Sequence, residues 1–266
     1  MFKHITEAMQ IARTKEKNAE FTFGVHAPSL LALVPDNQAT IMTQLEAEET
    51  IHALGNSVMG SVRSLNEKFG LLRQAIMYSF IWRLHPEHGV QFFVYRRTKR
   101  NNEGQLSQRL SLGAGGHFEL VDVNRLFDGE EDNYSQVIDL PGTCIENYYR
   151  ERGEEVDLDD LFANPYEAPT LHGFVMDSQP TPGYVGNIHF GMLAGVQVSD
   201  PAVELQMKEA HNDAEGWFTP DELRAIANGD TKILGEGEEV NFEPWSKLMI
   251  VKIEDLVATF ELDQAA

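Results

Sequence analysis

The strongest hydrophobic pattern in the chain lies between residues 75 and 95. Residues 75–82 form a nearly continuous apolar run, which is typical of a buried β-strand. A short polar turn that contains Pro86 and Gly89 separates this run from a second apolar segment, residues 91–95. We therefore predict two adjacent strands, and a β-hairpin is the simplest connection between them.

Helical and strand patterns also precede this hairpin. We predict a short helix over residues 3–17 and a short strand over residues 21–25. Residues 42–69 read as mostly helical, with interruptions near Gly55 and Gly60, because glycine weakens a helix interior.

The segments that follow the hairpin complete the pattern. Residues 184–198 contain two apolar stretches, which can form one bent strand, and a helix entered at a proline is expected over residues 220–228. A last helix is expected over residues 245–260. Strands mixed with helices predict an α/β protein, built as an α/β/α sandwich around a mixed sheet. We expect residues 1–74 to form an N-terminal extension, helical with a short strand, and residues 75–266 to form the main domain.

Composition and charge narrow the classes of partner. With 266 residues and 42% hydrophobic residues, the chain can bury an ordinary packed core. Its formal net charge of −21 argues against binding to a nucleic-acid duplex, which depends on clustered Lys and Arg. A single buried phosphate pocket, and hence a small-molecule partner, remains compatible with this charge.

The chain also lacks several features of secreted and membrane proteins. Cys144 is the only cysteine, so neither an intramolecular disulfide nor a cysteine-based zinc cluster can form. Residues 1–20 have no signal-peptide core, and the sequence has no apolar stretch of about 18 residues or more. We therefore expect a cytoplasmic protein without a membrane partner, and a homodimer remains an open alternative.

A cluster of three carboxylates provides the main candidate for chemistry. Glu151, Glu154 and Glu155 stand at positions i, i+3 and i+4, so a helix would gather them on one face. Like charges at this spacing repel, and a hard divalent cation such as Mg²⁺ or Mn²⁺ would offset them. Arg150 is four residues before Glu154 and can hold it by a charge-assisted hydrogen bond. The alternative is a solvated acidic helix face, which is common in acidic chains.

The residues around this cluster resemble those of the Nudix family. Residues 150–158 fit the helix half of the Nudix box, Arg-Glu-apolar-x-Glu-Glu-x-Gly-apolar, at all four charged positions. Upstream, residues 111–117, Ser-Leu-Gly-Ala-Gly-Gly-His, resemble the strand and double glycine that open this box. Downstream, residues 216–223 resemble the Trp-Phe, Pro, acid-Glu-Leu entry to the last helix of many Nudix domains. Together with residues 95–99 and 186–191, these landmarks resemble a branch usually labelled predicted phosphoesterases.

The resemblance covers residues 75–255 and implies both a fold and a reaction. It implies a Nudix-type hydrolase that cleaves a phosphoanhydride in a nucleoside diphosphate linked to another moiety, by metal-assisted attack of water. The implied cofactor is Mg²⁺ or Mn²⁺, and the partner is a small nucleotide. The implied site comprises Arg150 with the ligands Glu151, Glu154 and Glu155, and the carbonyl group of Gly116 as a further ligand.

Substrate-binding residues are expected near the double glycine. Strand alternation predicts that only one of Arg96 and Arg97 faces the site, where it could hold a phosphate, and that the other is solvated. Both could instead belong to a charged hairpin end that keeps an edge strand soluble. His117 could donate to a phosphate or a base, or be structural, and we interpret His189 as a core histidine.

The general base is left open by the sequence. The resemblance implies a base on a loop outside the motif helix, although a motif glutamate could itself activate the water. The loop candidates are Glu204, Glu209, Asp213 and Glu215.

Several positions depart from the family pattern. Pro141 and Gly142 occupy the places where the family has Gly-Glu, and Arg152 replaces an aliphatic residue. An acidic insertion at residues 119–139 is expected to be a mobile segment at the mouth of the site. These departures motivate two alternatives, a non-catalytic Nudix-fold module that binds a nucleotide or a protein, and an acidic protein that imitates nucleic acid.

Overall fold

A computed structural model gives the fold of the protein. The residues that it describes are 21–55, 57–62, 72–98, 107–127, 134–155, 169–178, 185–208, 212–234 and 240–265. Within these ranges, no helix is long and apolar enough to cross a membrane. The predicted helix over residues 3–17 lies outside the described residues.

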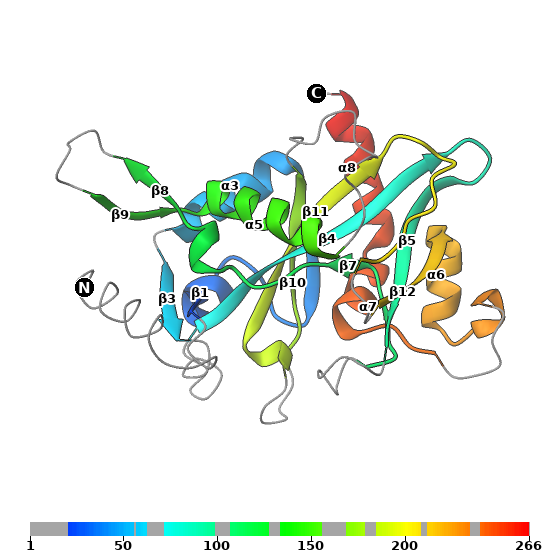
Figure 1. Cartoon of the computed structure of the whole chain (residues 1–266), viewed down its shortest axis with the longest axis horizontal. Helices are drawn as coiled ribbons and strands as arrows, with labels where there is room; N and C mark the ends of the chain where they lie inside the picture. The colour runs from blue at the N-terminus through cyan, green and yellow to red at the C-terminus, as the bar shows by residue number, and fades with distance from the viewer. Residues whose placement is uncertain are drawn as a thin grey trace.

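In the described part of the chain, ten strands form a mixed sheet at the centre of the molecule (Figure 1). Its main path runs in the order β12-β5-β4-β11-β10-β2. The two central strands, β4 and β11, are parallel, whereas the other pairs on this path are antiparallel. The strands on the path are β2 (Gln38–Ile41), β4 (Leu72–His85), β5 (Gly89–Arg97), β10 (Thr170–Met176), β11 (His189–Val198) and β12 (Asn212–Phe218).

The long apolar run gives the central strand its position. β4 has sheet neighbours on both sides, and Met77, Phe80 and Trp82 along it are all buried. It turns into β5 through a tight hairpin in which His85 pairs with Gly89. The predicted hairpin is therefore confirmed. The bent strand expected within residues 184–198 is confirmed only over β11, because residues 185–187 form a 3-10 helix, η2 (Val185–Asn187).

Helices cover both faces of the sheet (Figure 1). On one face, α3 and α5 bury apolar residues such as Ile51 and Cys144 in one core cluster. On the other face, α6, α7 and α8 contribute to a second cluster, in which the rings of Phe260 and Trp82 stack with centroids 4.0 Å apart. The predicted α/β/α sandwich around a mixed sheet is confirmed. The helices are α2 (Ala27–Leu31), α3 (Gln44–Gly55), α5 (Leu140–Glu155), α6 (Pro220–Ala227), α7 (Pro244–Val251) and α8 (Ile253–Ala265).

The last two helical predictions have different outcomes. α6 begins at Pro220 as predicted, and a capping box between Thr219 and Glu222 satisfies its first N–H groups. The continuous helix expected over residues 245–260 is instead divided at Lys252, whose φ of −107° leaves the helical region. Buried isoleucines lie on both sides of the break, so the hydrophobic pattern does not reveal it.

The N-terminal residues join the same sheet. β1 (Phe21–His26) pairs with both β3 (Val58–Val62) and β4, and β2 pairs with β10. The predicted strand over residues 21–25 is confirmed, but the helical prediction is wrong for residues 58–62. Val58 favours a strand once β1 offers a partner, because β-branched residues pack well on a paired, pleated surface.

The acidic insertion has regular structure at both of its ends. A 3-10 helix, η1 (Leu120–Asp122), is followed by the antiparallel pair β8 (Asn124–Phe127) and β9 (Tyr134–Asp139), which leads directly into α5. This hairpin projects from the body of the molecule (Figure 1). Asp122, by contrast, is only 2% exposed. The expectation of a mobile segment is therefore wrong at Asp122, which is packed against the motif helix.

Acid should weaken the fold through His172. Its ring is packed between Phe80 and Phe260, and this burial lowers the pKa of His172 to about 4. The unfolded chain then binds a proton that the folded protein excludes, so stability falls as pH drops from about 6.5 towards 4. From pH 7 to pH 5, we expect the wild type to lose about 2 kcal/mol of unfolding free energy more than a His172→Asn variant.

Denaturant unfolding of both proteins at the two pH values measures this difference. The asparagine amide keeps a polar atom facing the hydroxyl group of Thr259, which lies 2.9 Å from Nδ1 of His172. Equal losses for the two proteins would contradict the prediction.

Candidate active site

The motif carboxylates lie on the last turns of α5. The side chain of Glu151 is 12% exposed, whereas that of Glu154 is 60% exposed, so they share the helix but not the same burial. Arg150 contacts both, at 2.6 Å from Glu151 Oε1 and 3.6 Å from Glu154 Oε2. Arg150 forms an ion pair with Glu154, but the distance is too long for the predicted hydrogen bond, and the close contact is to Glu151. The side chain of Glu155 lies outside the described residues.

The double glycine brings the backbone against this helix. Gly115 has a φ of +147°, which disfavours any residue with a Cβ atom, and such an atom would collide with the carbonyl oxygen of Met77. A Cβ atom on Gly116 would collide with the carboxylate of Glu151. Gly115 is therefore required by the backbone of β4, whereas a side chain at position 116 would displace the carboxylate of Glu151. Gly116 and Glu151, expected together from the sequence, are neighbours in space.

Arg150 is held mainly by a residue that the sequence did not indicate. Its Nε and Nη2 atoms donate to Oδ1 and Oδ2 of Asp122, both at 2.9 Å, which forms a bidentate ion pair. Nη2 also donates to the carbonyl oxygen of His117 at 2.9 Å. Asp122 is one of many acidic residues in the insertion, and no sequence pattern distinguishes it from the others.

Burial and pairing set the charge states of these groups. Burial raises the pKa of Glu151 to about 7, although the neighbouring guanidinium group of Arg150 opposes the shift. Burial also acts to raise the pKa of Asp122, but hydrogen bonds from Arg150, the N–H of Glu119 and Asn147 hold it below its usual value. Hydrogen bonding to Asp122 raises the pKa of Arg150. The arrangement thus favours the anionic form of Asp122 and disfavours the anionic form of Glu151.

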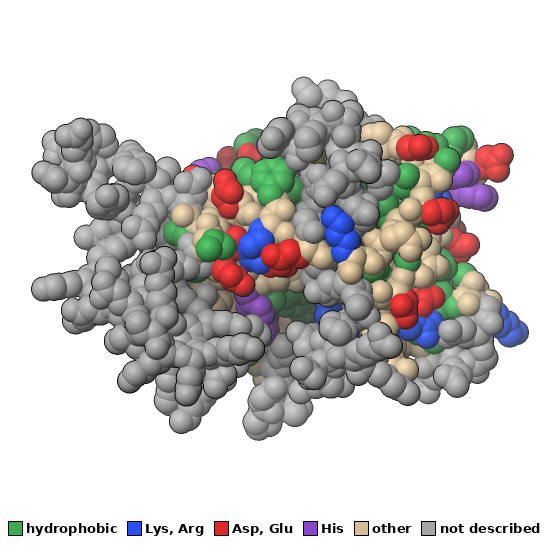
Figure 2. Space-filling model, viewed as in Figure 1, with side chains coloured by type: hydrophobic (Ala, Val, Ile, Leu, Met, Phe, Trp, Pro, Cys, Tyr) green, Lys and Arg blue, Asp and Glu red, His purple; other side chains and the backbone are tan. Residues whose placement is uncertain are grey.

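The side chains of His117 and His189 contact each other. Nε2 of His117 lies 2.8 Å from Nε2 of His189, which projects from β11 and is 4% exposed. The side chain of His117 therefore contacts a buried residue next to the double glycine. On the face of the molecule that carries α5, acidic, basic and histidine side chains lie close together (Figure 2).

The two arginines at the end of β5 are both paired with carboxylates. Nε of Arg96 lies 2.5 Å from Glu215, and Nε of Arg97 lies 3.5 Å from Glu243. Their side chains are 19% and 16% exposed, so the expectation that one of them is solvated is wrong. Each pairs with an acidic residue distant in sequence, and the ion pair makes burial of the charge tolerable.

The candidates for the general base differ in their surroundings. Glu204 and Asp213 are exposed, whereas Glu215 is engaged by Arg96. Glu209 lies outside the described residues.

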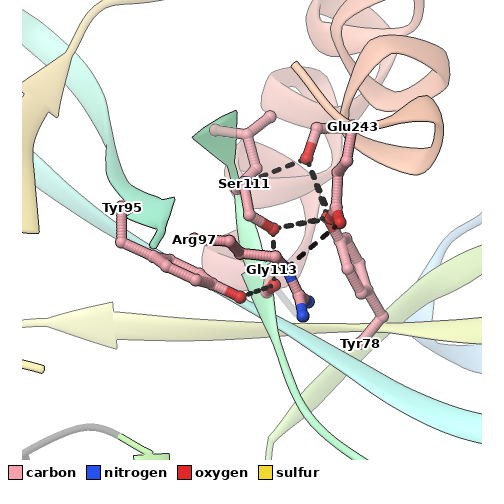
Figure 3. Close-up of polar contacts among 8 residues, drawn as sticks. Tyr78, Tyr95, Arg97, Ser111, Gly113 and Glu243 are labelled. Atoms are coloured by element: carbon pink, nitrogen blue, oxygen red, sulfur yellow. Dashed lines mark hydrogen bonds and ion pairs between the residues drawn. The ribbon is translucent and has the colours of Figure 1, made fainter. Parts of the chain in front are cut away.

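A second buried polar network supports the other end of the glycine segment (Figure 3). Glu243, 4% exposed, accepts hydrogen bonds from the hydroxyl groups of Tyr78, Ser111 and Ser246. Burial raises the pKa of Tyr78 well above its usual value, so its hydroxyl group remains a donor. Sequence reasoning missed Glu243, and its place immediately before Pro244 indicates only the start of a helix.

Hydrogen bonds fix both ends of residues 113–117. The carbonyl oxygen of Gly113 accepts a hydrogen bond from Tyr95 Oη at 2.8 Å and lies 2.8 Å from Ser111 Oγ, whose single hydroxyl hydrogen it shares with Glu243. At the other end, the carbonyl oxygen of His117 accepts from Asn147 and Arg150. The segment that presents Gly116 to Glu151 is therefore anchored on both sides.

The chain was compared with family models and with known proteins. No family model matches the chain. Over 134 residues it is 27% identical to Protein YmaB of Bacillus subtilis (strain 168). This stretch covers 50% of the chain and 55% of YmaB, so the match extends over about half of the curated relative.

Solved structures give a broader match. The crystal structure of Tm1382, described as a candidate Nudix hydrolase, shares 18% identity with the chain and aligns with a TM-score of 0.60. The alignment covers 89% of this chain and 100% of Tm1382. The chain has a Nudix-like fold. A Nudix hydrolase from Alicyclobacillus acidocaldarius gives a TM-score of 0.38 at 16% identity, over 70% of this chain and 91% of the other.

Proposed function

We propose that the protein is a Nudix-type hydrolase, of the branch labelled predicted phosphoesterases, that cleaves a phosphoanhydride in a nucleoside diphosphate linked to another moiety. The observation that carries this proposal is the position of Glu151. Its carboxylate is mostly buried on α5 and abuts Gly116 of the double glycine, within a Nudix-like fold.

The described residues fit a hard divalent cation, Mg²⁺ or Mn²⁺, in the chemistry of their donors. Glu151 and Glu154 offer carboxylate oxygens, and Gly116 lets a backbone carbonyl group approach them. Among the described residues, no three His, Cys, Asp or Glu side chains already form a metal cluster, and the side chain of Glu155 is not among those described. We assign Glu151, Glu154, Glu155 and the carbonyl group of Gly116 as the ligands. A bound cation would neutralise the diphosphate oxygens and lower the pKa of a water molecule.

Residues outside the ligand set orient the site and hold the substrate. Arg150 fixes the carboxylate of Glu151 through their 2.6 Å contact. A substrate phosphate would compete with Glu215 for Arg96 or with Glu243 for Arg97. Release of Arg97 would leave a more deeply buried carboxylate without its cation, so we assign the phosphate contact to Arg96.

The alternative function is a non-catalytic Nudix-fold module that binds a nucleotide or a protein. It is favoured by Pro141 and Gly142, which lie in the first turn of α5 and replace the Gly-Glu pair of the family. A panel of nucleoside triphosphates, dinucleotides, sugar nucleotides, ADP-ribose and capped RNA, incubated with and without Mg²⁺, distinguishes the two. Metal-dependent release of a phosphorylated product supports the hydrolase, whereas binding without turnover supports the module.

Divalent metal should stabilise the folded protein. A cation that binds only the native state raises the melting temperature by mass action, and here it would also relieve the repulsion among the motif carboxylates. We expect millimolar Mg²⁺ or Mn²⁺ to raise the melting temperature by several degrees. For a domain of this size, the rise is about 4 °C for each factor of ten by which the metal concentration exceeds its Kd. Melting curves at matched ionic strength provide the test. A shift no larger than that produced by NaCl would count against the metal site.

A further inference from the structure

We propose that Asp122, contributed by the acidic insertion, is a positioning residue of the active site, which holds Arg150 and thereby orients both Glu151 and the double-glycine segment. This inference rests on the proposed function, because it assigns a role within the same site. Asp122 acts through its neighbours and not on the substrate.

The contacts of Asp122 identify it as the centre of this arrangement. Its two carboxylate oxygens accept one hydrogen bond each from Nε and Nη2 of Arg150, both at 2.9 Å. Oδ2 also accepts from Asn147 Nδ2 at 3.0 Å and from the backbone N–H of Glu119 at 2.8 Å. Four donors thus surround a carboxylate that is 2% exposed. Such a pairing fixes the plane of the guanidinium group as well as its position.

Arg150 transmits this constraint to the two halves of the site. With its plane fixed by Asp122, its Nη1 lies 2.6 Å from Glu151 Oε1 and its Nη2 donates to the carbonyl oxygen of His117. Asn147 repeats the second link, because its Nδ2 donates both to Asp122 and to the same carbonyl oxygen. Gly116 immediately precedes His117, so the backbone facing Glu151 is positioned by the same unit.

Alternative roles for Asp122 fit the geometry less well. A surface ion pair would leave it exposed, and a ligand for a cation would have an oxygen directed away from Arg150. Both of its oxygens are instead occupied by donors from α5. The insertion therefore contributes to the site through this one buried carboxylate, while its hairpin extends outward (Figure 1).

The first test is the variant Asp122→Asn in the full-length protein. We expect kcat to fall about 10- to 100-fold, as for other residues that orient a metal-site ligand. KM should change by no more than about twofold, because the substrate is not contacted. Asp255→Asn is the matched control, since it makes the same chemical change at an exposed carboxylate of α8, on the opposite face of the sheet. Wild-type kcat in Asp122→Asn, or an equal loss in Asp255→Asn, would overturn the inference.

A second comparison remains decisive even if Asp122→Asn does not fold. The double variant Asp122→Asn/Arg150→Gln leaves neither a buried arginine nor a buried carboxylate without its partner, and it is compared with Arg150→Gln. Because Asp122 is proposed to act through Arg150, the two should have the same kcat within about twofold. A further large loss in the double variant would overturn the inference.

Hydrogen exchange separates this inference from the hydrolase assignment. In Asp122→Asn, or in the double variant compared with wild type, amide exchange should accelerate in the peptide that contains Gly115 to Phe118. Asp255→Asn should leave the exchange of this peptide unchanged. A wild-type protein that is inactive on every nucleotide would overturn the proposed function. Faster amide exchange in the Asp122 variants would still support the positioning role in that case. Unchanged exchange together with unchanged kcat would overturn the positioning role alone.

Discussion

Glu151→Gln should abolish most of the hydrolysis while the protein stays folded. Glutamine has nearly the same shape but cannot supply an anionic oxygen to a divalent cation, so we expect kcat to fall at least about a hundredfold. The metal-free fold should tolerate the change, because burial already disfavours the Glu151 anion and raises its pKa to about 7. Initial rates at saturating Mg²⁺, together with a melting curve, measure both effects.

Glu146→Gln is the control for this prediction. Glu146 lies on the same helix and is exposed, and its replacement by glutamine removes the same charge. It should retain activity within about twofold, as surface changes away from a site usually do. Equal losses in the two variants would show that the acidity of the helix is being measured and would contradict the assigned site.

Glu243→Ala should produce the largest loss of stability. It removes the acceptor shared by Tyr78, Ser111 and Ser246 and the carboxylate paired with Arg97, which leaves buried donors and a buried cation unsatisfied. Breaking such a buried pair costs about 3–5 kcal/mol. Equilibrium unfolding in urea measures the loss.

An exposed ion pair provides the comparison for Glu243. Glu254 also pairs with an arginine, Arg224, but its side chain is 67% exposed. Glu254→Ala should therefore cost less than about 1 kcal/mol. If the two variants lost similar stability, the network in Figure 3 would not hold the fold together as described.

The two buried networks explain how an acidic chain builds a precise site. Glu243 and Asp122 each collect several donors, and each controls the carbonyl group at one end of residues 113–117. Glu243 does so through Ser111, and Asp122 does so through Arg150. Buried carboxylates with complete hydrogen bonding rigidify their surroundings. The position of Gly116 thus depends on both sides of the sheet.

The local elements of the fold could be predicted because they depend on neighbouring residues. The apolar run at residues 75–82, the turn that ends at Gly89 and the proline at position 220 each predicted an element that the structure contains. The errors arose where tertiary partners changed the outcome. Residues 58–62 became a strand beside β1, and Arg96 and Arg97 both became partly buried in ion pairs with Glu215 and Glu243.

The sequence by itself determined the α/β class, the helix that carries Glu151 and Glu154 and the glycine loop that faces it. Side-chain directions in a helix and backbone freedom at glycine are local properties, so they can be read from spacing. Only the tertiary structure decided which other carboxylates support this helix and this loop. Asp122 meets Arg150 across 28 residues and Glu243 meets Tyr78 across 165, and both acids look like many others in a chain with 42 acidic residues. Such contacts depend on the path of the whole chain, and burial selects the few carboxylates whose charge must be matched by donors.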